Sequence, residues 1–187
     1  RINVVSETGE AIHNYRLLSI VTKLYLEANQ GSVKKIAVPI LASREVEMIA
    51  ADYGVELVYT KNNHSAMMDA TKDPDISFVG GTRGGFIFPS FLFSVDGMFA
   101  IAKIMEMCAR TGTTIGQLHA ELPRRAVTER SVECPWELKG RVMRHAMHHS
   151  EGGRRLLVDG VKMFLEDDWV MLIPDKERPL FHVVAET

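Results

Sequence analysis

Residues 14–60 read NYRLLSIVTKLYLEANQGSVKKIAVPILASREVEMIAADYGVELVYT, and several hydrophobic patterns follow one another in this stretch. In residues 14–28 apolar side chains recur at helical spacing, which predicts an amphipathic helix. Residues 36–40 and 55–60 are short apolar runs typical of buried strands, and a second helical pattern lies between them. Helix, strand, helix and strand at these lengths indicate a sheet that is covered by helices on both faces.

A glycine-rich loop and an apolar helix come next along the chain. Residues 78–79 and 87–88 are further strand candidates on either side of the loop. Residues 95–109 are apolar nearly all round, which predicts a helix that is largely buried. The ten methionines of the chain, among them Met98 and Met105, are interpreted as flexible filler of the core.

Side chains that cap helices mark several helix starts. Asn14 and Ser43 precede helical patterns and can accept hydrogen bonds from the first free backbone N–H groups. Thr114 and Gln117 have the spacing of a capping box, which predicts a short helix that ends before Pro123. The pattern changes after Pro123, which indicates a domain boundary in this region.

The last third of the chain has the pattern of a strand, a helix and a hairpin. Residues 126–134 predict a strand, and residues 135–149 predict a helix that starts at a proline. Residues 161–165 and 169–173 predict a hairpin. Residues 181–185 predict a last strand, so this part is expected to be α+β.

Together these patterns predict an α/β protein with two domains. Residues 1–110 are expected to form a three-layer α/β domain with a mixed sheet. Residues 111–123 are expected to form a connector, and residues 124–187 a smaller α+β domain. A chain of 187 residues is long enough for one large domain or two small ones.

Composition and charge exclude several classes of protein. Hydrophobic residues make up 46% and charged residues 25%, which are ordinary globular proportions. The formal net charge of -2 argues against broad adhesion to nucleic acid or to an anionic membrane. No apolar run is unbroken enough to span a bilayer, and Cys108 and Cys134 form neither a disulfide framework nor a zinc motif. A cytoplasmic protein is predicted, and the start at Arg1 without a signal peptide indicates a fragment.

The most distinctive local motif is GGTRGG at residues 80–85. Its glycines let a backbone approach a ligand closely or turn sharply, and Arg83 could hold an anion. No Gly-Lys-Ser/Thr follows, as a P-loop requires. The motif also does not open a helix after a first strand, as a dinucleotide fingerprint does. From the residues alone, a tight turn and a ligand contact both remain open interpretations.

Histidines occur in two contexts. His64 follows a strand end in a polar loop, where it either contacts a ligand or caps a helix over residues 65–70. His145, His148 and His149 have helical spacing, but no carboxylate or cysteine completes a zinc set, and they are interpreted as a solvated face. No serine or cysteine has a recognisable activating partner. Neither a catalytic residue nor a metal ligand is therefore predicted.

Four segments in a fixed order carry a resemblance to a known family: residues 1–10, His64-Ser65, residues 81–86 and residues 173–179. They resemble segments from the C-terminal half of the α-D-phosphohexomutases, the phosphoglucomutase and phosphomannomutase superfamily. The first resembles the stretch after that family's metal loop, and the second its Gly-His-Ser-x-x-Lys segment. The last two align with its sugar-recognition loop, Gly-Glu-x-Ser-Gly-His, and its phosphate loop, Arg-Pro-Ser-Gly-Thr-Glu-Pro. The resemblance covers essentially the whole chain, as that family's third and fourth domains.

The resemblance implies a sugar-phosphate site with altered chemistry. Its candidate substrate contacts are His64, Thr82, Arg83, Gly84 and Gly85. Thr82 and Gly84 replace the glutamate and serine of the sugar loop, and Phe86 replaces its histidine. Met68 replaces the lysine that follows the family's histidine.

The segment that resembles the phosphate loop also departs from the family. Ile173, Asp175 and Glu177 replace its arginine, serine and threonine. Lys176 and Arg178 remain as the candidate phosphate contacts, but two cations beside two carboxylates offer little net attraction at an exposed loop. Exchanging Lys176 and Arg178 together for alanine is therefore expected to leave sugar-phosphate affinity almost unchanged.

The segment GGFIFP at residues 84–89 is similar to one branch of this family. In that branch a mannose-1-phosphate guanylyltransferase, a nucleotidyltransferase, is fused to mutase-like (isomerase-like) domains. The resemblance implies the C-terminal fragment of such a protein, which binds a hexose phosphate such as mannose-1-phosphate or glucose-1-phosphate without independent catalysis. Its expected partners are that ligand and the N-terminal domains of the same chain. Magnesium is expected only in those domains, and the alternative is a structural or regulatory module that no longer binds sugar phosphate.

Overall fold

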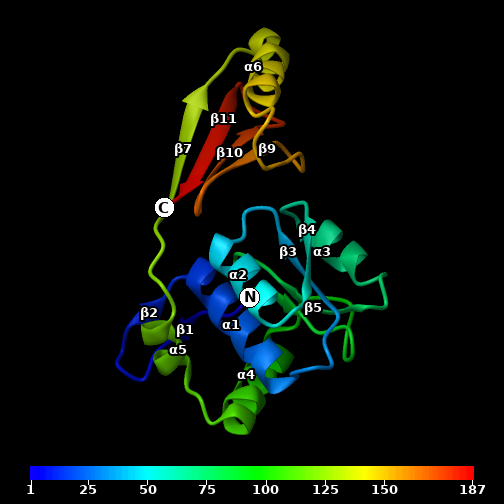
Figure 1. Ribbon diagram of the computed structural model, residues 1–187, viewed down its shortest axis with the longest axis vertical. Helices are drawn as coiled ribbons and strands as arrows, with labels where there is room; N and C mark the ends of the chain where they lie inside the picture. Colours follow the sequence, from blue (N-terminus) through cyan, green and yellow to red (C-terminus); the bar gives the residue numbers. More distant parts are fainter. The chain divides into compact units, whose positions relative to one another are not determined.

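The chain folds into two units, each built around its own sheet (Figure 1). The computed structural model describes all residues, Arg1–Thr187, and divides into Arg1–Pro123 and Arg124–Thr187. Residues 111–123, expected as a connector, lie within the first unit. Each unit is described below by itself.

The first unit contains a four-stranded mixed sheet in the order β4-β3-β5-β6. Its strands are β3 (Lys35–Pro39), β4 (Glu56–Thr60), β5 (Ile76–Gly80) and β6 (Phe86–Ile87). β3 pairs in parallel with both β4 and β5, whereas β6 is antiparallel to β5. The mixed sheet predicted from the sequence is confirmed, and the parallel strands β3, β4 and β5 end at the same edge.

Helices cover both faces of this sheet, as the alternating pattern predicts. They are α1 (Asn14–Ala28), α2 (Arg44–Asp52), α3 (His64–Ala70) and α4 (Gly97–Thr111). α1 packs against α2 and α4, and these helices share a core cluster with Ile36 and Val38 of β3. On the opposite face Ala37 and Val79 pack with Met67 of α3. Successive residues of a strand point to opposite faces, so one short strand serves both cores.

A small ribbon and helix α5 complete the first unit. The ribbon pairs β1 (Val4–Val5) with β2 (Ala11–Ile12), and α5 spans Ile115–Glu121. The predicted capping box is present, because the Thr114 hydroxyl accepts from the Gln117 N–H at 3.1 Å and the Gln117 side chain accepts from the Thr114 N–H at 2.8 Å. Arg16 of α1 donates to the carbonyl of His119 at 2.6 Å, which holds α5 against α1.

The second unit is an antiparallel sheet with one long helix. Its elements are β7 (Val127–Glu133), α6 (Trp136–His149), β8 (Arg155–Leu156), β9 (Val161–Leu165), β10 (Asp168–Pro174) and β11 (Leu180–Glu186). The strand order is β7-β11-β10-β9-β8, and α6 packs against β9 and β10. The predicted strand, helix and hairpin are therefore all present, and β8 is an additional edge strand.

The interior of the second unit includes charged side chains as well as apolar ones. Val161 and Met171 are fully buried, and so is Lys162. The Lys162 ammonium lies 3.9 Å from the ring centroid of Trp169, close enough for a cation–π interaction. The Trp169 indole N–H in turn donates to the Glu186 carboxylate at 2.8 Å. A buried charge of this kind is stable only with such partners.

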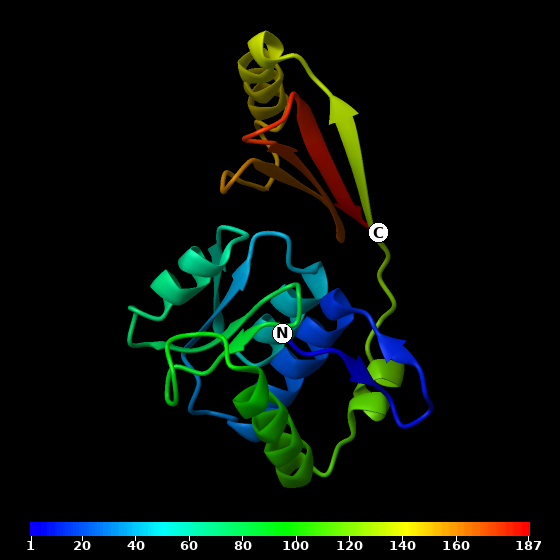
Figure 2. The ribbon, with the colours of Figure 1, turned by 180° about the vertical axis from the view of Figure 1, so that it is seen from behind.

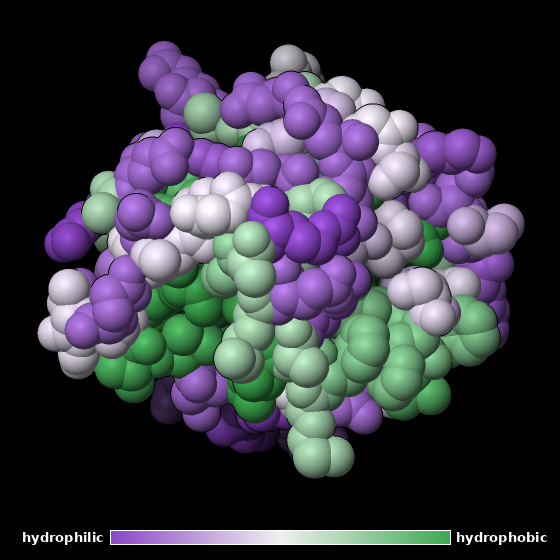
Figure 3. All heavy atoms as spheres, turned by 90° about the horizontal axis from the view of Figure 1, so that it is seen from below, coloured by the Kyte–Doolittle hydropathy of each residue, from purple (hydrophilic) through white to green (hydrophobic).

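Helix α4 differs from its prediction, because it is not buried all round. Ala100, Ile104 and Met107 are buried, whereas Met98 is 83% exposed and Met105 67% exposed. Met98 and Met105 are therefore not core filler, although Met107 is. Figure 3 shows that apolar side chains gather over part of the surface seen from below. None of the helices combines the length and apolar character that crossing a membrane requires.

The predicted helix caps agree with the structure in part. The Ser43 hydroxyl accepts from the Glu45 N–H at 3.1 Å at the start of α2. His13 rather than Asn14 occupies the N-cap position of α1 and makes no side-chain cap bond. The carbonyl oxygen of the Asn14 side chain is instead buried without a hydrogen-bond partner. The start of α1 is therefore held by packing of its apolar face rather than by a cap.

Candidate functional site

Three loops meet at the carboxyl edge of the parallel strands in the first unit. β3 ends at Pro39, β4 at Thr60 and β5 at Gly80. Residues 61–64 follow β4, and residues 81–85 follow β5. Open α/β sheets bind ligands at this edge, where the loops carry side chains that the core does not use. The predicted contact Arg83 lies in the loop after β5, and His64 is the first residue of α3, directly after the loop that follows β4.

The loops enclose a cleft of about 80 Å³. It is lined by Arg1, Pro39, Asn62, Asn63, His64, Met67, Gly81, Thr82, Arg83 and Gly85. This lining contains arginines, a histidine and amides but no carboxylate. It therefore offers N–H donors and positive charge, which suit an anionic or hydroxyl-rich ligand.

The glycine-rich loop is shaped by close backbone contacts. Gly84 has a φ of +72°, and a Cβ at this position would lie 2.3 Å from the carbonyl oxygen of Ile2. The Ile2 N–H donates to the carbonyl of Gly84 at 2.8 Å, and the Gly81 N–H donates to the carbonyl of Gly85 at 2.8 Å. Figure 2 shows the first residues of the chain beside this loop. Gly84 thus shapes the turn, whereas Gly81 and Gly85 line the cleft.

Both open interpretations of the loop therefore have a structural counterpart. It is a tight turn between antiparallel strands β5 and β6, and three of its residues besides Gly81 line the cleft: Thr82, Arg83 and Gly85. Thr82 is 5% exposed, whereas the Arg83 side chain is exposed and makes no hydrogen bond or ion pair within the chain. The Arg83 guanidinium keeps all its donors for a ligand.

His64 lies at the mouth of the same cleft, as the first residue of α3. Its imidazole is exposed and makes no hydrogen bond or ion pair within the chain. The cap of α3 is Asn63, whose side-chain oxygen accepts from the Ala66 N–H at 2.8 Å. The interpretation of His64 as a helix cap is therefore wrong, and its imidazole stays available to a ligand.

Pro39, Asn62, Asn63 and Met67 also line the cleft, although no sequence motif marks them as ligand contacts. Pro39 reads as part of an apolar strand, and Met67 as a core residue of α3. Their position is the feature by which they could be found. Pro39, Asn62 and Asn63 lie at or just beyond the carboxyl end of a parallel strand, and Met67 packs under that edge of the sheet. The amide pair after β4 is the clearest such signal, since amides both donate and accept hydrogen bonds.

Two of the replaced family positions lie outside the cleft. Phe86 is 1% exposed and belongs to the core of the first unit. Met68 is 42% exposed on α3 and does not line the cleft. A histidine at position 86 or a lysine at position 68 is thus replaced by an apolar group, one inside the core and one on the surface.

In the second unit, the candidate phosphate contacts Lys176 and Arg178 each face a carboxylate of the same unit. The Arg178 guanidinium is 3.1 Å from the Asp175 carboxylate, and the Lys176 ammonium is 3.9 Å from the Asp159 carboxylate. The Lys176 side chain is 83% exposed, so its ion pair contributes little. Arg178 is therefore not free for an external anion in the way that Arg83 is, whereas Lys176 is exposed and only weakly paired.

The histidines of α6 have the solvated positions that their spacing predicts. His145, His148 and His149 are exposed, and the rings of His145 and His149 lie 3.9 Å apart. His148 pairs with the Glu151 carboxylate at 3.2 Å. The chain has no group of three or more His, Cys, Asp or Glu side chains placed to hold a metal ion.

The chain thus consists of an α/β domain with a cleft at the carboxyl edge of its parallel strands, followed by a smaller α+β domain. Residues 13–126 match the family described as phosphoglucomutase/phosphomannomutase, alpha/beta/alpha domain III. The chain therefore belongs to the phosphoglucomutase/phosphomannomutase family. This agrees with the resemblance carried by the glycine-rich loop and its neighbours.

Curated relatives share this assignment. The chain is 29% identical, over 188 residues, to a probable phosphoglucosamine mutase of Methanopyrus kandleri, and the match covers all of the chain and 41% of that protein. It is 27% identical to a phosphoglucomutase/phosphomannomutase of Thermococcus kodakarensis, covering 97% of the chain and 40% of that protein. The chain thus spans about two fifths of the length of the curated relatives it matches.

Solved structures show that the fold of the whole chain is that of this family. A phosphoglucomutase/phosphomannomutase family protein of Burkholderia thailandensis aligns with a TM-score of 0.80 at 19% identity, covering 100% of the chain and 40% of that protein. The N-acetylphosphoglucosamine mutase of Aspergillus fumigatus, solved with GlcNAc-6P and magnesium, aligns with a TM-score of 0.62 at 11% identity, covering 99% of the chain and 46% of that protein.

Proposed function

We propose that this chain supplies a sugar-phosphate-binding surface of a phosphohexomutase-like protein. The observation that carries the proposal is the acid-free cleft at the carboxyl edge of β3, β4 and β5, with Arg83 and His64 unpaired at its mouth. Family membership supports the same ligand class, because the relatives are named as mutases of sugar phosphates.

The lining suits a hexose phosphate group by group. The Arg83 guanidinium can bind two phosphate oxygens at once. The imidazole of His64 and the amides of Asn62 and Asn63 can exchange hydrogen bonds with sugar hydroxyls. Gly81 and Gly85 carry no side chain, so a ligand can approach their backbone closely. Charge fixes the phosphate, and the amides orient the ring.

We expect no phosphoryl transfer by the chain alone. The cleft lining holds no carboxylate, so it offers no such ligand for a metal ion that would neutralise the charge on the transferred phosphoryl group. Magnesium, if the longer protein uses it, is expected to be held outside these 187 residues. Detectable turnover of any hexose phosphate by the purified chain would overturn this part of the proposal.

Calorimetric titration tests the binding surface. Glucose-1-phosphate, mannose-1-phosphate and a glucosamine phosphate are titrated into the wild-type chain at low salt. Binding of at least one is expected, and Arg83→Ala should weaken it by about tenfold or more, because one charge-assisted bidentate contact is lost. Arg130→Ala is the matched control, since Arg130 is an exposed arginine on β7 in the other unit.

The alternative function is a structural or regulatory module that has lost sugar-phosphate binding. For the second unit this alternative is favoured, because the Arg178 side chain already donates hydrogen bonds to the Asp175 carboxylate. The absence of heat with all three sugar phosphates would favour this alternative for the whole chain. Equal affinities of wild type and Arg83→Ala would show that binding occurs away from the cleft.

The predicted fusion to a mannose-1-phosphate guanylyltransferase is a finer proposal. The relatives described above are named as mutases, and they lend support to the mutase-like part alone. Sequencing the gene upstream of the codon for Arg1 tests the fusion directly. A nucleotidyltransferase domain is the expected result, and a serine loop with an aspartate triplet would instead indicate a mutase.

A further inference from the structure

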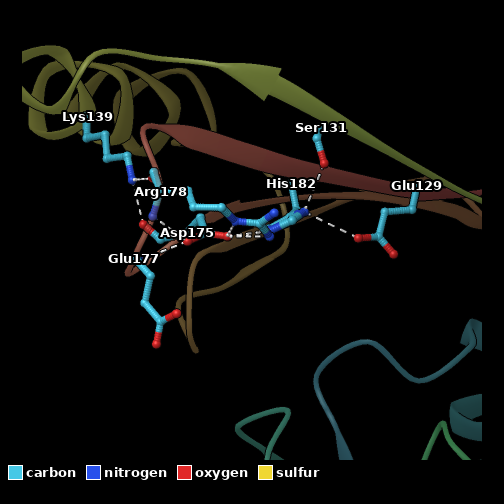
Figure 4. A network of polar contacts seen from close by, with 7 residues as sticks. All are labelled: Glu129, Ser131, Lys139, Asp175, Glu177, Arg178 and His182. Atoms are coloured by element: carbon cyan, nitrogen blue, oxygen red, sulfur yellow. Dashed lines mark hydrogen bonds and ion pairs between the residues drawn. The ribbon is translucent and has the colours of Figure 1, made fainter.

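The loop that follows β10 in the second unit is folded around one of its own carboxylates (Figure 4). Asp175 Oδ1 accepts from the backbone N–H groups of Glu177 and Arg178, each at 2.8 Å. Asp175 Oδ2 accepts from the Arg178 guanidinium at 3.1 Å and from His182 Nε2 at 3.0 Å. Backbone N–H groups, a guanidinium and an imidazole are the donors that bind phosphate in proteins.

The loop is held in this shape from outside by α6. The buried Lys139 ammonium donates to the carbonyl oxygens of both Asp175 and Arg178. The same ammonium lies 3.8 Å from the ring centroid of Trp136. Because the carbonyls are tied to Lys139, the N–H groups of the loop are left to point at the carboxylate. Figure 4 shows the Glu177 side chain directed away from this cluster.

His182 connects the loop to the neighbouring strand. Its Nδ1 lies 3.3 Å from the Glu129 carboxylate and 3.2 Å from the Ser131 hydroxyl, both on β7. Its Nε2 is therefore directed at Asp175 and away from solvent, and only 11% of the Asp175 side chain is exposed. The donors also hold the pKa of Asp175 well below its ordinary value, the Glu177 N–H first and His182 next. The carboxylate stays charged at any physiological pH.

We infer that this loop is an anion-binding site that its own Asp175 carboxylate fills, so that the site is closed to external phosphate. The carboxylate uses the backbone N–H groups, the guanidinium and the imidazole that a phosphate would need. A phosphate that approached would also meet the fixed negative charge of Asp175, and juxtaposed like charges strongly disfavour binding. The inference does not depend on the ligand of the cleft in the first unit, because the two sites share no residue.

Removing the carboxylate while leaving the donors in place tests this inference. In Asp175→Ala the loop has an empty, positively charged pocket, and inorganic phosphate is expected to bind there at least about tenfold more tightly than to the wild type. In Asp175→Asn the side chain still fills the space, so no gain in phosphate binding is expected. Asp175→Ala combined with Arg178→Ala lacks the guanidinium and should lose the gain.

The readout is the amide NMR spectrum of the full chain titrated with inorganic phosphate at constant ionic strength. The N–H signals of Glu177 and Arg178 should shift with saturation in Asp175→Ala and stay unchanged in the wild type. If Asp175→Ala does not fold alone, phosphate but not chloride should restore its folded spectrum, since a ligand of the native state stabilises that state. A saturable shift of these signals in the wild type, or no response of Asp175→Ala in either assay, would overturn the inference.

Discussion

Arg16 shows how one largely buried cation can organise backbone that is far away in sequence. Its guanidinium donates to the Glu45 carboxylate at 3.0 Å and to the carbonyl of His119 at 2.6 Å. It also donates to the carbonyls of Leu122 and Pro123. Helices end with carbonyl groups that have no partner within the helix. Arg16 therefore does for the end of α5 what a cap residue does elsewhere, and it fixes the residues that precede the second unit.

Arg16→Ala should destabilise the first unit by about 3–5 kcal/mol, because Glu45 is left buried and unpaired. The Glu45 side chain is 6% exposed and that of Arg16 11% exposed. All four tyrosines lie in the first unit, so urea unfolding followed by tyrosine absorbance reports on it. Lys23→Ala is the control, since its partner Glu121 is 61% exposed and the pair should contribute at most about 1 kcal/mol. Equal effects of the two variants would refute this role of Arg16.

The stability of the second unit is predicted to depend on pH through Asp175. Its pKa is lowered in the folded chain by the Glu177 N–H, by His182 and by Arg178. A carboxylate with a lowered pKa stabilises the fold above its ordinary pKa and loses this contribution as the pH falls. The stability advantage of wild type over Asp175→Asn should therefore be present above about pH 5 and shrink below about pH 4.

Tryptophan fluorescence measures this advantage selectively. Trp136 and Trp169 are the only tryptophans of the chain, and both lie in the second unit. Urea unfolding of wild type and Asp175→Asn is followed by tryptophan emission over a series of pH values. An advantage that stays constant, or grows, between about pH 4 and pH 2 would contradict the account of Asp175 as a paired carboxylate.

At the scale of single elements, α4 shows that a hydrophobic side chain on a helix need not be buried. Met105 and Met107 are chemically identical and belong to the same helix, yet Met105 is 67% exposed and Met107 is fully buried. Met107→Ala should cost about 2–5 kcal/mol, because it leaves a cavity in the core. Met105→Ala should change stability by at most about 0.5 kcal/mol. The same tyrosine-detected unfolding measures both, and similar costs would show that the outer face of α4 is also packed.

The elements themselves could largely be predicted from the sequence, because their signals are local. The capping box joins Thr114 and Gln117 across one turn, and the continuous apolar run of residues 36–40 predicts a strand that is buried on both faces, as β3 is. The exposure of Met98 and Met105 on α4 could not be predicted. A helix with apolar residues on all sides does not show which side meets the core. The prediction of Asn14 as the N-cap of α1 is wrong by one residue, since His13 occupies that position and makes no side-chain cap bond.

The candidate site could be predicted only in so far as the sequence pattern indicates which strands are parallel neighbours in the sheet. His64 and Arg83 follow different parallel strands, and the rule for carboxyl edges brings such residues together. The pairing of Asp175 with His182 depends on the register of β10 and β11, in which Ile173 lies opposite His182. The bond from Arg16 to His119 joins residues 103 positions apart. No sequence pattern records either juxtaposition.

At the scale of the whole molecule, the two units differ in whether the arginine of a candidate anion-binding loop is paired within the chain. In the first unit, Arg83 in the loop after β5 is unpaired and lines a cleft without carboxylates. In the second unit, Arg178 in the loop after β10 forms an ion pair with Asp175. A sugar phosphate is therefore expected to contact one unit and not the other.

The most direct test is one amide NMR titration of the wild-type chain with glucose-1-phosphate and, separately, mannose-1-phosphate. Saturable shifts are predicted for residues 62–64, 67 and 81–85, which line or flank the cleft, with no shifts for residues 175–178. The free Arg83 guanidinium gives the first set its affinity, and the Asp175 carboxylate keeps the second set closed. Shifts confined to residues 175–178, or no shifts with either sugar phosphate, would contradict the account.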